Sequence, residues 1–193
     1  GGGMRMGNPN APIKIVEYGA LSCPHCARLA NEGMKTIVDK YVNSGRVSYE
    51  FRSFIIHGEI DLLLTQLVRC ADKAAFFPLV EQLYATQEQW IGVAEKAGAA
   101  AQAAQSLPPA QRFGALADAY GLTDWFAARG VSKDQAHACL ANTDQAQAIA
   151  TQTQKWSTDQ GIDQTPTIFI NGGKTNIAEW KDLEPALQNA GAR

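Results

Sequence analysis

The run Cys23-Pro24-His25-Cys26 places two cysteines three positions apart, directly after a strand-like segment at residues 13–18. On the first turn of a helix, residues at this spacing lie on one side. A disulfide accepts Cα atoms roughly 4.4 to 6.8 Å apart, so the two sulfurs can bond and separate without large backbone movement. The motif therefore predicts a site for thiol-disulfide exchange.

Cys23 is predicted to be the reactive cysteine, because the thiolate is the nucleophile and a helix N-terminus stabilises an anion. Pro24 suits the first turn, where a missing N–H costs nothing, and Cys26 has the burial expected of a resolving cysteine. His25 is expected to add a donor or a positive charge beside the sulfur; the alternative is an exposed imidazole without a role. Each tenfold gain in Cys23 acidity favours the reduced form by about 1.36 kcal/mol, which makes the disulfide an oxidant.

Two further positions are candidates for the same site. Glu17 lies mid-strand among apolar residues, where burial would raise its pKa and let it shuttle the proton of Cys26; an edge-strand glutamate facing water is the alternative. Thr165-Pro166 stands at the start of another strand-like segment. A cis bond there would leave the preceding backbone open to an extended substrate peptide, whereas a trans proline would only end the preceding segment.

A metal site is the main rival interpretation of the cysteine motif. Zinc usually needs a second ligand pair with similar local spacing, and His137 with Cys139 is poorly spaced for this purpose. Two thiolates alone suffice for monovalent copper, so a copper-handling thiol chaperone stays open as an alternative. The sequence predicts no metal ligands and no cofactor beyond the redox-active disulfide.

Cys70 and Cys139 form a second, distant pair, which brings the cysteines to an even count of 4. In a reducing compartment they would be two separate buried thiols, and in an oxidising one they could bridge. A structural disulfide is favoured. It would close a loop of about 70 residues, for which chain entropy gives roughly 4 kcal/mol.

Length and composition exclude several classes of protein. The 193 residues, 46% hydrophobic and 19% charged, suffice for a real core. A net charge of -2 and scattered basic residues argue against nucleic acid or anionic lipid as partners. No apolar run approaches the roughly 18 residues of a membrane helix. The glycine-rich start suggests an engineered, disordered extension over residues 1–7, and a signal peptide is expected to have been removed.

Periodicity predicts a sheet domain split by helices. A helix is expected over residues 24–44, ended by Gly45, then a strand at residues 47–51 that continues buried through residues 54–56. The strand pattern returns at residues 167–171, followed by a Gly172-Gly173 turn, a short strand ending near residue 177 and a last helix. In that helix Asp182 is the predicted cap, Pro185 falls in the first turn, and Leu183 and Leu187 face the sheet.

Between these parts, the two-residue period disappears. Helical segments are predicted at residues 62–68, 79–84, 94–104, 113–120 and 146–156, and Ser132 with Gln135 resembles a capping box. The predicted division is therefore a discontinuous domain, residues 8–56 and 157–193, with an inserted helical domain over residues 57–156.

These features together resemble the DsbA type of the thioredoxin superfamily: an acid six residues before the motif, Cys-Pro-His-Cys, a helical insertion and a late Thr-Pro, over about residues 8–190. The resemblance implies an α/β thioredoxin fold interrupted by a large helical insertion, a cis Thr165-Pro166 bond and a periplasmic or otherwise extracytoplasmic location. The second cysteine pair resembles that of members with a disulfide in the helical domain.

The leading functional prediction is an oxidase that donates the Cys23-Cys26 disulfide to reduced exported polypeptides through a mixed disulfide at Cys23. The resemblance implies a membrane quinone-linked re-oxidase as partner, and a monomer is expected. A disulfide isomerase or reductase of the same fold is the first alternative, and the copper chaperone is the second.

Overall fold

The structure is a computed structural model that describes residues 2–193. It contains two compact units. The sheet unit comprises the chain up to His57 together with Thr153–Arg193, and the helical unit comprises Gly58–Gln152. The predicted division fell after residues 56 and 156. Helix α9 (Thr143–Gln160) runs through the second boundary without interruption, which is why no turn signal in the sequence marks it.

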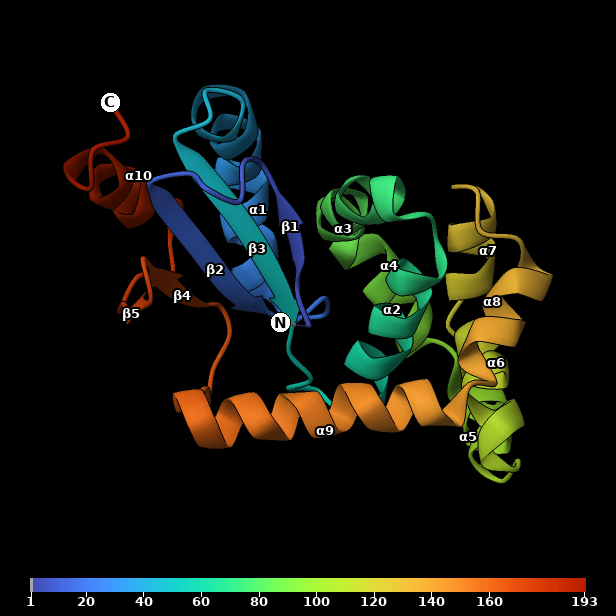
Figure 1. The fold of residues 1–193 in the computed structure, drawn as a ribbon. Helices are drawn as coiled ribbons and strands as arrows, with labels where there is room; N and C mark the ends of the chain where they lie inside the picture. The colour runs from blue at the N-terminus through green and yellow to red at the C-terminus, as the bar shows by residue number, and fades with distance from the viewer. Residues whose placement is uncertain (1) are drawn as a thin grey trace. The chain divides into compact units, whose positions relative to one another are not determined.

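The sheet unit is built on five strands in the order β1-β3-β2-β4-β5 (Figure 1). They are β1 (Met4–Met6), β2 (Ile13–Gly19), β3 (Val47–Ser53), β4 (Thr167–Ile170) and β5 (Gly173–Lys174). Strands β2 and β3 are parallel, and the other pairings are antiparallel. Because β2 lies between β3 and β4, a residue in its centre is enclosed on both sides.

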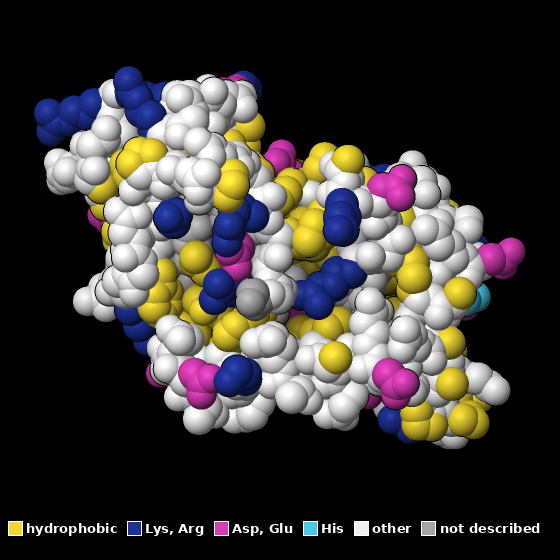
Figure 2. Space-filling view, viewed as in Figure 1, with side chains coloured by type: hydrophobic (Ala, Val, Ile, Leu, Met, Phe, Trp, Pro, Cys, Tyr) yellow, Lys and Arg dark blue, Asp and Glu magenta, His cyan; other side chains and the backbone are white. Residues whose placement is uncertain are grey.

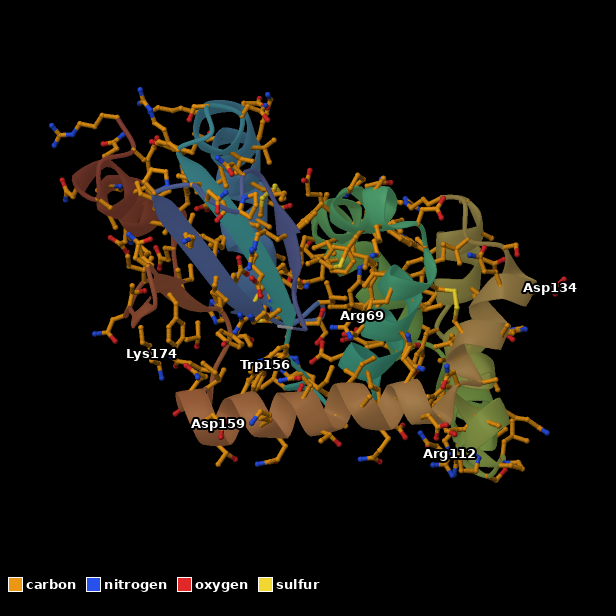
Figure 3. All side chains as sticks on the ribbon, viewed as in Figure 1. Arg69, Arg112, Asp134, Trp156, Asp159 and Lys174 are labelled. Atoms are coloured by element: carbon orange, nitrogen blue, oxygen red, sulfur yellow. A yellow bond between two sulfur atoms is a disulfide. The ribbon has the colours of Figure 1, made fainter. Side chains whose placement is uncertain are left out.

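Two helices of this unit contact one another closely, namely α1 (Pro24–Thr36) and α10 (Trp180–Asn189). The absence of a side chain at Gly33 allows it, since a Cβ there would lie 2.5 Å from the Trp180 ring. The C-terminal part of α9 covers the Tyr18 side of the sheet. Trp156 projects from it toward the strands and packs edge-on against Tyr18 with ring centroids 5.3 Å apart (Figure 3).

The prediction that residues 1–7 are a disordered extension is wrong for Met4–Met6, which form strand β1. This strand pairs antiparallel with β3, and the Arg5 guanidinium lies 2.6 Å from the buried carboxylate of Glu50. The sequence pattern of three residues is too short to reveal an edge strand, whose stability comes from the neighbouring strand. Gly1 lies outside the described residues.

The helix predicted over residues 24–44 is confirmed as far as Val42: after α1 it continues as a π-helical segment, Ile37–Val42, and Gly45 follows in the left-handed region with φ of 77°. Two other local predictions are corrected. Strand β5 ends at Lys174 instead of near residue 177. In α10 the residue before the first turn is Glu179, so Asp182 lies inside the helix, and Pro185 falls beyond the first turn.

The helical unit contains more helices than periodicity predicted, because several are short. They are α2 (Glu59–Cys70), η2 (Lys73–Ala75), α3 (Phe76–Ala85), α4 (Gln87–Glu95), α5 (Gly98–Gln105), α6 (Pro109–Ala119), α7 (Leu122–Ala127), α8 (Lys133–Leu140) and the first part of α9. The segment predicted at residues 94–104 is broken before α5, at whose start Gly98 has a φ of 43°. The Ser132 cap is confirmed: its hydroxyl accepts the Gln135 backbone N–H at 3.2 Å.

The surface mixes side chains of all kinds. On the face shown in Figure 2, basic, acidic and hydrophobic side chains all reach the surface. In the part of the chain from residue 2 onward, no helix is long and apolar enough to cross a membrane.

The disulfide between Cys70 and Cys139 is confirmed, with the Cα atoms 6.0 Å apart. It joins the end of α2 to α8, and its sulfurs are drawn as a yellow bond in Figure 3. Side chains reinforce the same junction: the Gln135 amide donates to the Cys70 carbonyl at 3.0 Å, and the Gln66 amide donates to the Cys139 carbonyl at 3.3 Å.

Replacing both of these cysteines by alanine should lower the free energy of unfolding by about 4 kcal/mol, because the unfolded chain loses a cross-link across 69 residues. Chemical denaturation of the oxidised parent and the variant measures this difference. The matched control is full reduction of both proteins, after which parent and variant should unfold at the same denaturant concentration. Equal midpoints for parent and variant would contradict a stabilising role.

Candidate active site

The local chain path places Cys23 at the N-terminus of α1. Strand β2 ends at Gly19, and a turn follows in which the Cys23 N–H donates to the Ala20 carbonyl at 3.1 Å. Cys23 keeps an extended conformation as the residue before the helix, Pro24 occupies the first helical position, and the Ala27 N–H donates to the Cys23 carbonyl at 3.1 Å. The Cys23 sulfur thus meets the unpaired backbone N–H groups of the first turn.

Both cysteines of the motif are free thiols, and exposure separates them less than predicted. Cys23 is 4% exposed and Cys26 is 0% exposed, while Pro24 and His25 lie at the surface. What distinguishes the two sulfurs is their electrostatic environment.

The surroundings of Cys23 favour its thiolate. The hydrogen bond from the Cys26 thiol is the largest cause that lowers the pKa of Cys23 to about 5, against the opposing effect of burial. Thr165 and the backbone N–H groups of Cys26 and His25 lower the pKa further. Burial raises the pKa of Cys26 well above its usual value, and its interactions with Cys23 and Glu17 act in the same direction. One sulfur is therefore an anion at neutral pH, and the other is a thiol that donates to it.

His25 contributes to the environment of Cys23 through its backbone, and the predicted role of its imidazole stays a prediction. Its backbone N–H is the group that lowers the pKa of Cys23. The positive field of the imidazole instead contributes to lowering the pKa of the Glu179 carboxyl, after Lys181 and Arg28. The side chain thus affects the electrostatics of the surface around the motif.

Glu17 is buried in the centre of β2 and is 3% exposed, so the alternative of an edge-strand glutamate facing water is wrong. Its carboxyl oxygen Oε2 accepts the Tyr49 hydroxyl at 2.6 Å. Desolvation by burial raises the pKa of Glu17 to about 7, the Tyr49 hydrogen bond opposes this, and the negative charge of Cys23 adds to it. A carboxyl that titrates near neutral pH can give and accept a proton.

The Thr165-Pro166 peptide bond is cis and lies beside the motif, although 142 positions separate it from Cys23. The Cys23 thiol donates to the Thr165 carbonyl at 3.5 Å. The Thr165 hydroxyl is buried and makes no hydrogen bond in this state, within the described chain. It is therefore available to the thiolate, in agreement with its effect on the pKa of Cys23.

A family model described as thioredoxin matches residues 1–189. The chain belongs to the thioredoxin superfamily. Among solved structures, the protein-disulfide isomerase of Novosphingobium aromaticivorans superposes with a TM-score of 0.89 at 27% identity, covering 98% of each chain. Wolbachia pipientis alpha-DsbA1 superposes with a TM-score of 0.77 at 20% identity, covering 97% of this chain and 90% of that one.

These matches confirm the predicted thioredoxin fold, in which α2 to α9 form a helical insertion between β3 and β4. They also confirm the resemblance to DsbA-like disulfide oxidoreductases. A Rickettsia bellii protein provisionally named a protein-disulfide oxidoreductase is 24% identical over 187 residues, or 97% of this chain. Disulfide bond formation protein D of Bacillus subtilis is 22% identical over 194 residues, covering 95% of this chain and 74% of its own length. The chain spans 60% to 64% of the length of the first Rickettsia relatives.

Sequence reasoning missed two polar partners in this thioredoxin-like site. The first is Tyr49, which lies in the strand predicted at residues 47–51 and donates to Glu17. A buried phenol usually has a hydrogen-bond partner, and this rule is the signal that could have paired Tyr49 with the buried acid on another strand. The second partner is His57, whose Nδ1 lies 2.7 Å from the hydroxyl of Ser22, the residue before Cys23. No pattern in the sequence links these two.

Throughout residues 2–193, no group of three or more His, Cys, Asp or Glu side chains is arranged to hold a metal ion. The redox group that the residues can supply is the Cys23 and Cys26 pair itself.

The acidity of Cys23 can be measured directly. Titration of the thiolate absorbance of the reduced protein should give a midpoint near pH 5, because hydrogen bonds to the sulfur outweigh its burial. Cys23→Ser should abolish this transition. A midpoint near the free-thiol value of about 8.5 would contradict the geometry.

Thr165→Val tests the hydroxyl beside the sulfur. The substitution preserves shape and removes the donor, so the pKa of Cys23 should rise above that of the parent in the same titration. Thr167→Val is the matched control, since the Thr167 hydroxyl donates to the Gln164 carbonyl at 2.7 Å. If both variants titrate like the parent, the Thr165 hydroxyl has no part in stabilising the thiolate.

Proposed function

We propose that this chain is a dithiol-disulfide oxidase that donates its Cys23-Cys26 disulfide to exported proteins. A substrate thiolate attacks the Cys23 sulfur, the bond to Cys26 breaks, and Cys26 leaves as a thiolate that takes up a proton. A second substrate thiolate then attacks the substrate sulfur of the mixed disulfide and releases Cys23 as a thiolate. The substrate loses two electrons, and the Cys23-Cys26 pair gains them.

The stabilised thiolate of Cys23 is the observation that carries this proposal. An anion stabilised at this position favours the reduced form of the pair, and a disulfide whose reduced form is stabilised is an oxidant. A thiolate with a low pKa is also a good leaving group, so the mixed disulfide is resolved rapidly. In this proposal Glu17 supplies the proton that Cys26 needs, and the backbone before Pro166 pairs with an extended substrate.

The proposed setting follows from the same chemistry and from the family. Reduced, unfolded exported polypeptides are the substrates, a membrane quinone-linked enzyme restores the disulfide, and the chain acts as a monomer outside the cytoplasm. The Cys70-Cys139 disulfide supports an oxidising compartment, where such bonds persist.

The equilibrium with glutathione tests the direction of transfer. We expect the potential of the Cys23-Cys26 couple to lie well above the roughly -270 mV of a thioredoxin, toward the roughly -120 mV of DsbA. Counting the free thiols at each point keeps the second disulfide out of the measurement. A potential near that of thioredoxin would assign the protein to the reductants.

Stability should depend on redox state and on pH. The folded-state pKa of Cys23 lies near 5 against an ordinary value of 9.0, so its stabilisation is fully present above 9 and disappears as the pH falls through 5. Protein reduced at Cys23-Cys26 alone, with Cys70-Cys139 intact, should therefore melt above the oxidised protein at neutral pH, and the two melting temperatures should converge below pH 5. Burial of Glu17 acts in both redox states and largely cancels in the difference. An oxidised form that is the more stable at neutral pH would contradict the proposal.

An isomerase is the second candidate, because the Novosphingobium aromaticivorans protein with the TM-score of 0.89 is named a protein-disulfide isomerase. The two functions separate in an assay on a scrambled substrate with several disulfides. A reduced isomerase restores the activity of the scrambled substrate by rearranging its disulfides. The proposed oxidase instead acts in its oxidised form, on a substrate whose cysteines are reduced.

A further inference from the structure

We propose that Tyr49 is a positioning residue of this site, whose hydroxyl holds Glu17 so that the carboxyl can both give a proton to Cys26 and take one from it. The inference rests on the proposed function and adds to it a residue that governs the proton transfer.

The register of the sheet brings Tyr49 to Glu17. In the parallel pair β2 and β3, Ile15 lies opposite Tyr49 and Glu17 lies opposite Phe51. Tyr49 is two residues before Phe51 and therefore lies on the same face of β3. Its hydroxyl lies 2.6 Å from Glu17 Oε2. Both side chains are almost completely buried, at 2% and 3% exposure. A short bond between two buried groups holds the carboxyl in one orientation.

The other carboxyl oxygen lies toward the end of β2 that leads to the motif. A Cβ at Gly19 would lie 2.9 Å from Glu17 Oε1 and 2.5 Å from the Phe51 ring. Oε1 therefore lies against Gly19, where β2 ends and the segment leading to Cys23 begins. The two oxygens have separate surroundings: Tyr49 bonds Oε2, and Oε1 lies toward the end of the strand that carries the motif.

Disulfide donation and re-oxidation need opposite protonation states of this carboxyl. In donation, the Cys26 sulfur leaves Cys23 as a thiolate and receives the proton of the neutral Glu17 acid. In re-oxidation, the Glu17 carboxylate takes the proton of the Cys26 thiol. The Cys26 sulfur then attacks Cys23 in its mixed disulfide with the oxidant, and the oxidant leaves as a thiolate.

The groups around Glu17 balance these two states. Cys23 and Cys26 act on it from the motif and Tyr49 from β3, and its register partner on β4 is Ile168. Burial raises the pKa of Glu17, as does the charge of Cys23, and the hydrogen bond from Tyr49 is the cause that lowers it, leaving a value of about 7. Without the phenol the pKa of Glu17 would be higher, so a smaller fraction of the carboxyl could accept a proton at neutral pH.

The test is the pH profile of re-oxidation in Tyr49→Phe. Reduced protein is mixed with oxidised glutathione, the reaction is quenched at intervals, and the mixed disulfide at Cys23 and the closed Cys23-Cys26 disulfide are quantified by mass. We expect the closing step to be about tenfold slower below pH 7 and its midpoint to move to higher pH, since a hydrogen bond to a charged group is lost. Formation of the mixed disulfide should keep its rate.

Two controls separate positioning from a general effect on the fold. Tyr41→Phe removes another buried phenol that bonds a carboxylate, Glu184, at 2.7 Å, and it should leave the profile unchanged. Glu17→Gln should remove the profile, and Glu17→Gln with Tyr49→Phe should close no more slowly than Glu17→Gln alone, because Tyr49 acts through Glu17.

A Tyr49→Phe profile that superposes on that of the parent would overturn the proposal, as would additive effects of the two substitutions. The equilibrium potential with glutathione is measured on the same samples. A reducing potential would refute the oxidase function alone, because the shift of the profile depends on the Glu17 proton and not on the direction of net transfer.

Discussion

The stabilised anion at Cys23 is the interaction on which the rest of the site depends. A sulfur at the start of α1 receives donors from three sources: the Cys26 thiol, the backbone of the first turn and Thr165. The first two come from the same helix, and they exist as soon as that helix forms after β2. The third comes from the segment before β4 and requires the folded sheet. The chemistry therefore combines a local feature, which the motif brings with it, and a remote one.

The sheet unit shields Glu17 and Cys26, which exchange the proton, from water. Because β2 is flanked by β3 and β4, an acid in its centre is shielded from solvent, and the Tyr49 hydroxyl on β3 donates a hydrogen bond to it. The same strand order brings Thr165 and Pro166 to the end of β2 where the motif begins. Burial raises the pKa of both groups. Cys26 therefore stays a thiol, and Glu17 has a pKa of about 7, at which it can give or accept a proton.

The helical unit is stabilised by means of its own. Its disulfide joins α2 to α8, and the hydrogen bonds of Gln135 and Gln66 to the backbone at the two cysteines tie the same elements together. Many of its helices are short, and short helices are marginal by themselves, so their stability depends on packing and on this cross-link. The two disulfide-forming pairs consequently have different surroundings: one lies within a single helical turn beside an acid, and the other links two helices.

By itself, the sequence determined the motif, its position between a strand and a helix, the second cysteine pair and the split α/β pattern, because all of these depend on local spacing and periodicity. It also indicated that Glu17 is a buried acid, although it left a solvent-facing strand edge open. Only the tertiary structure decided that β2 is an inner strand, that Tyr49 is the donor to Glu17 and that Thr165 meets Cys23 across 142 positions. Residues 4–6 joined the sheet for a related reason: an edge strand is specified by the strand beside it. Pairing between strands is a contact between distant parts of the chain, and a pattern within one segment carries no record of its partner.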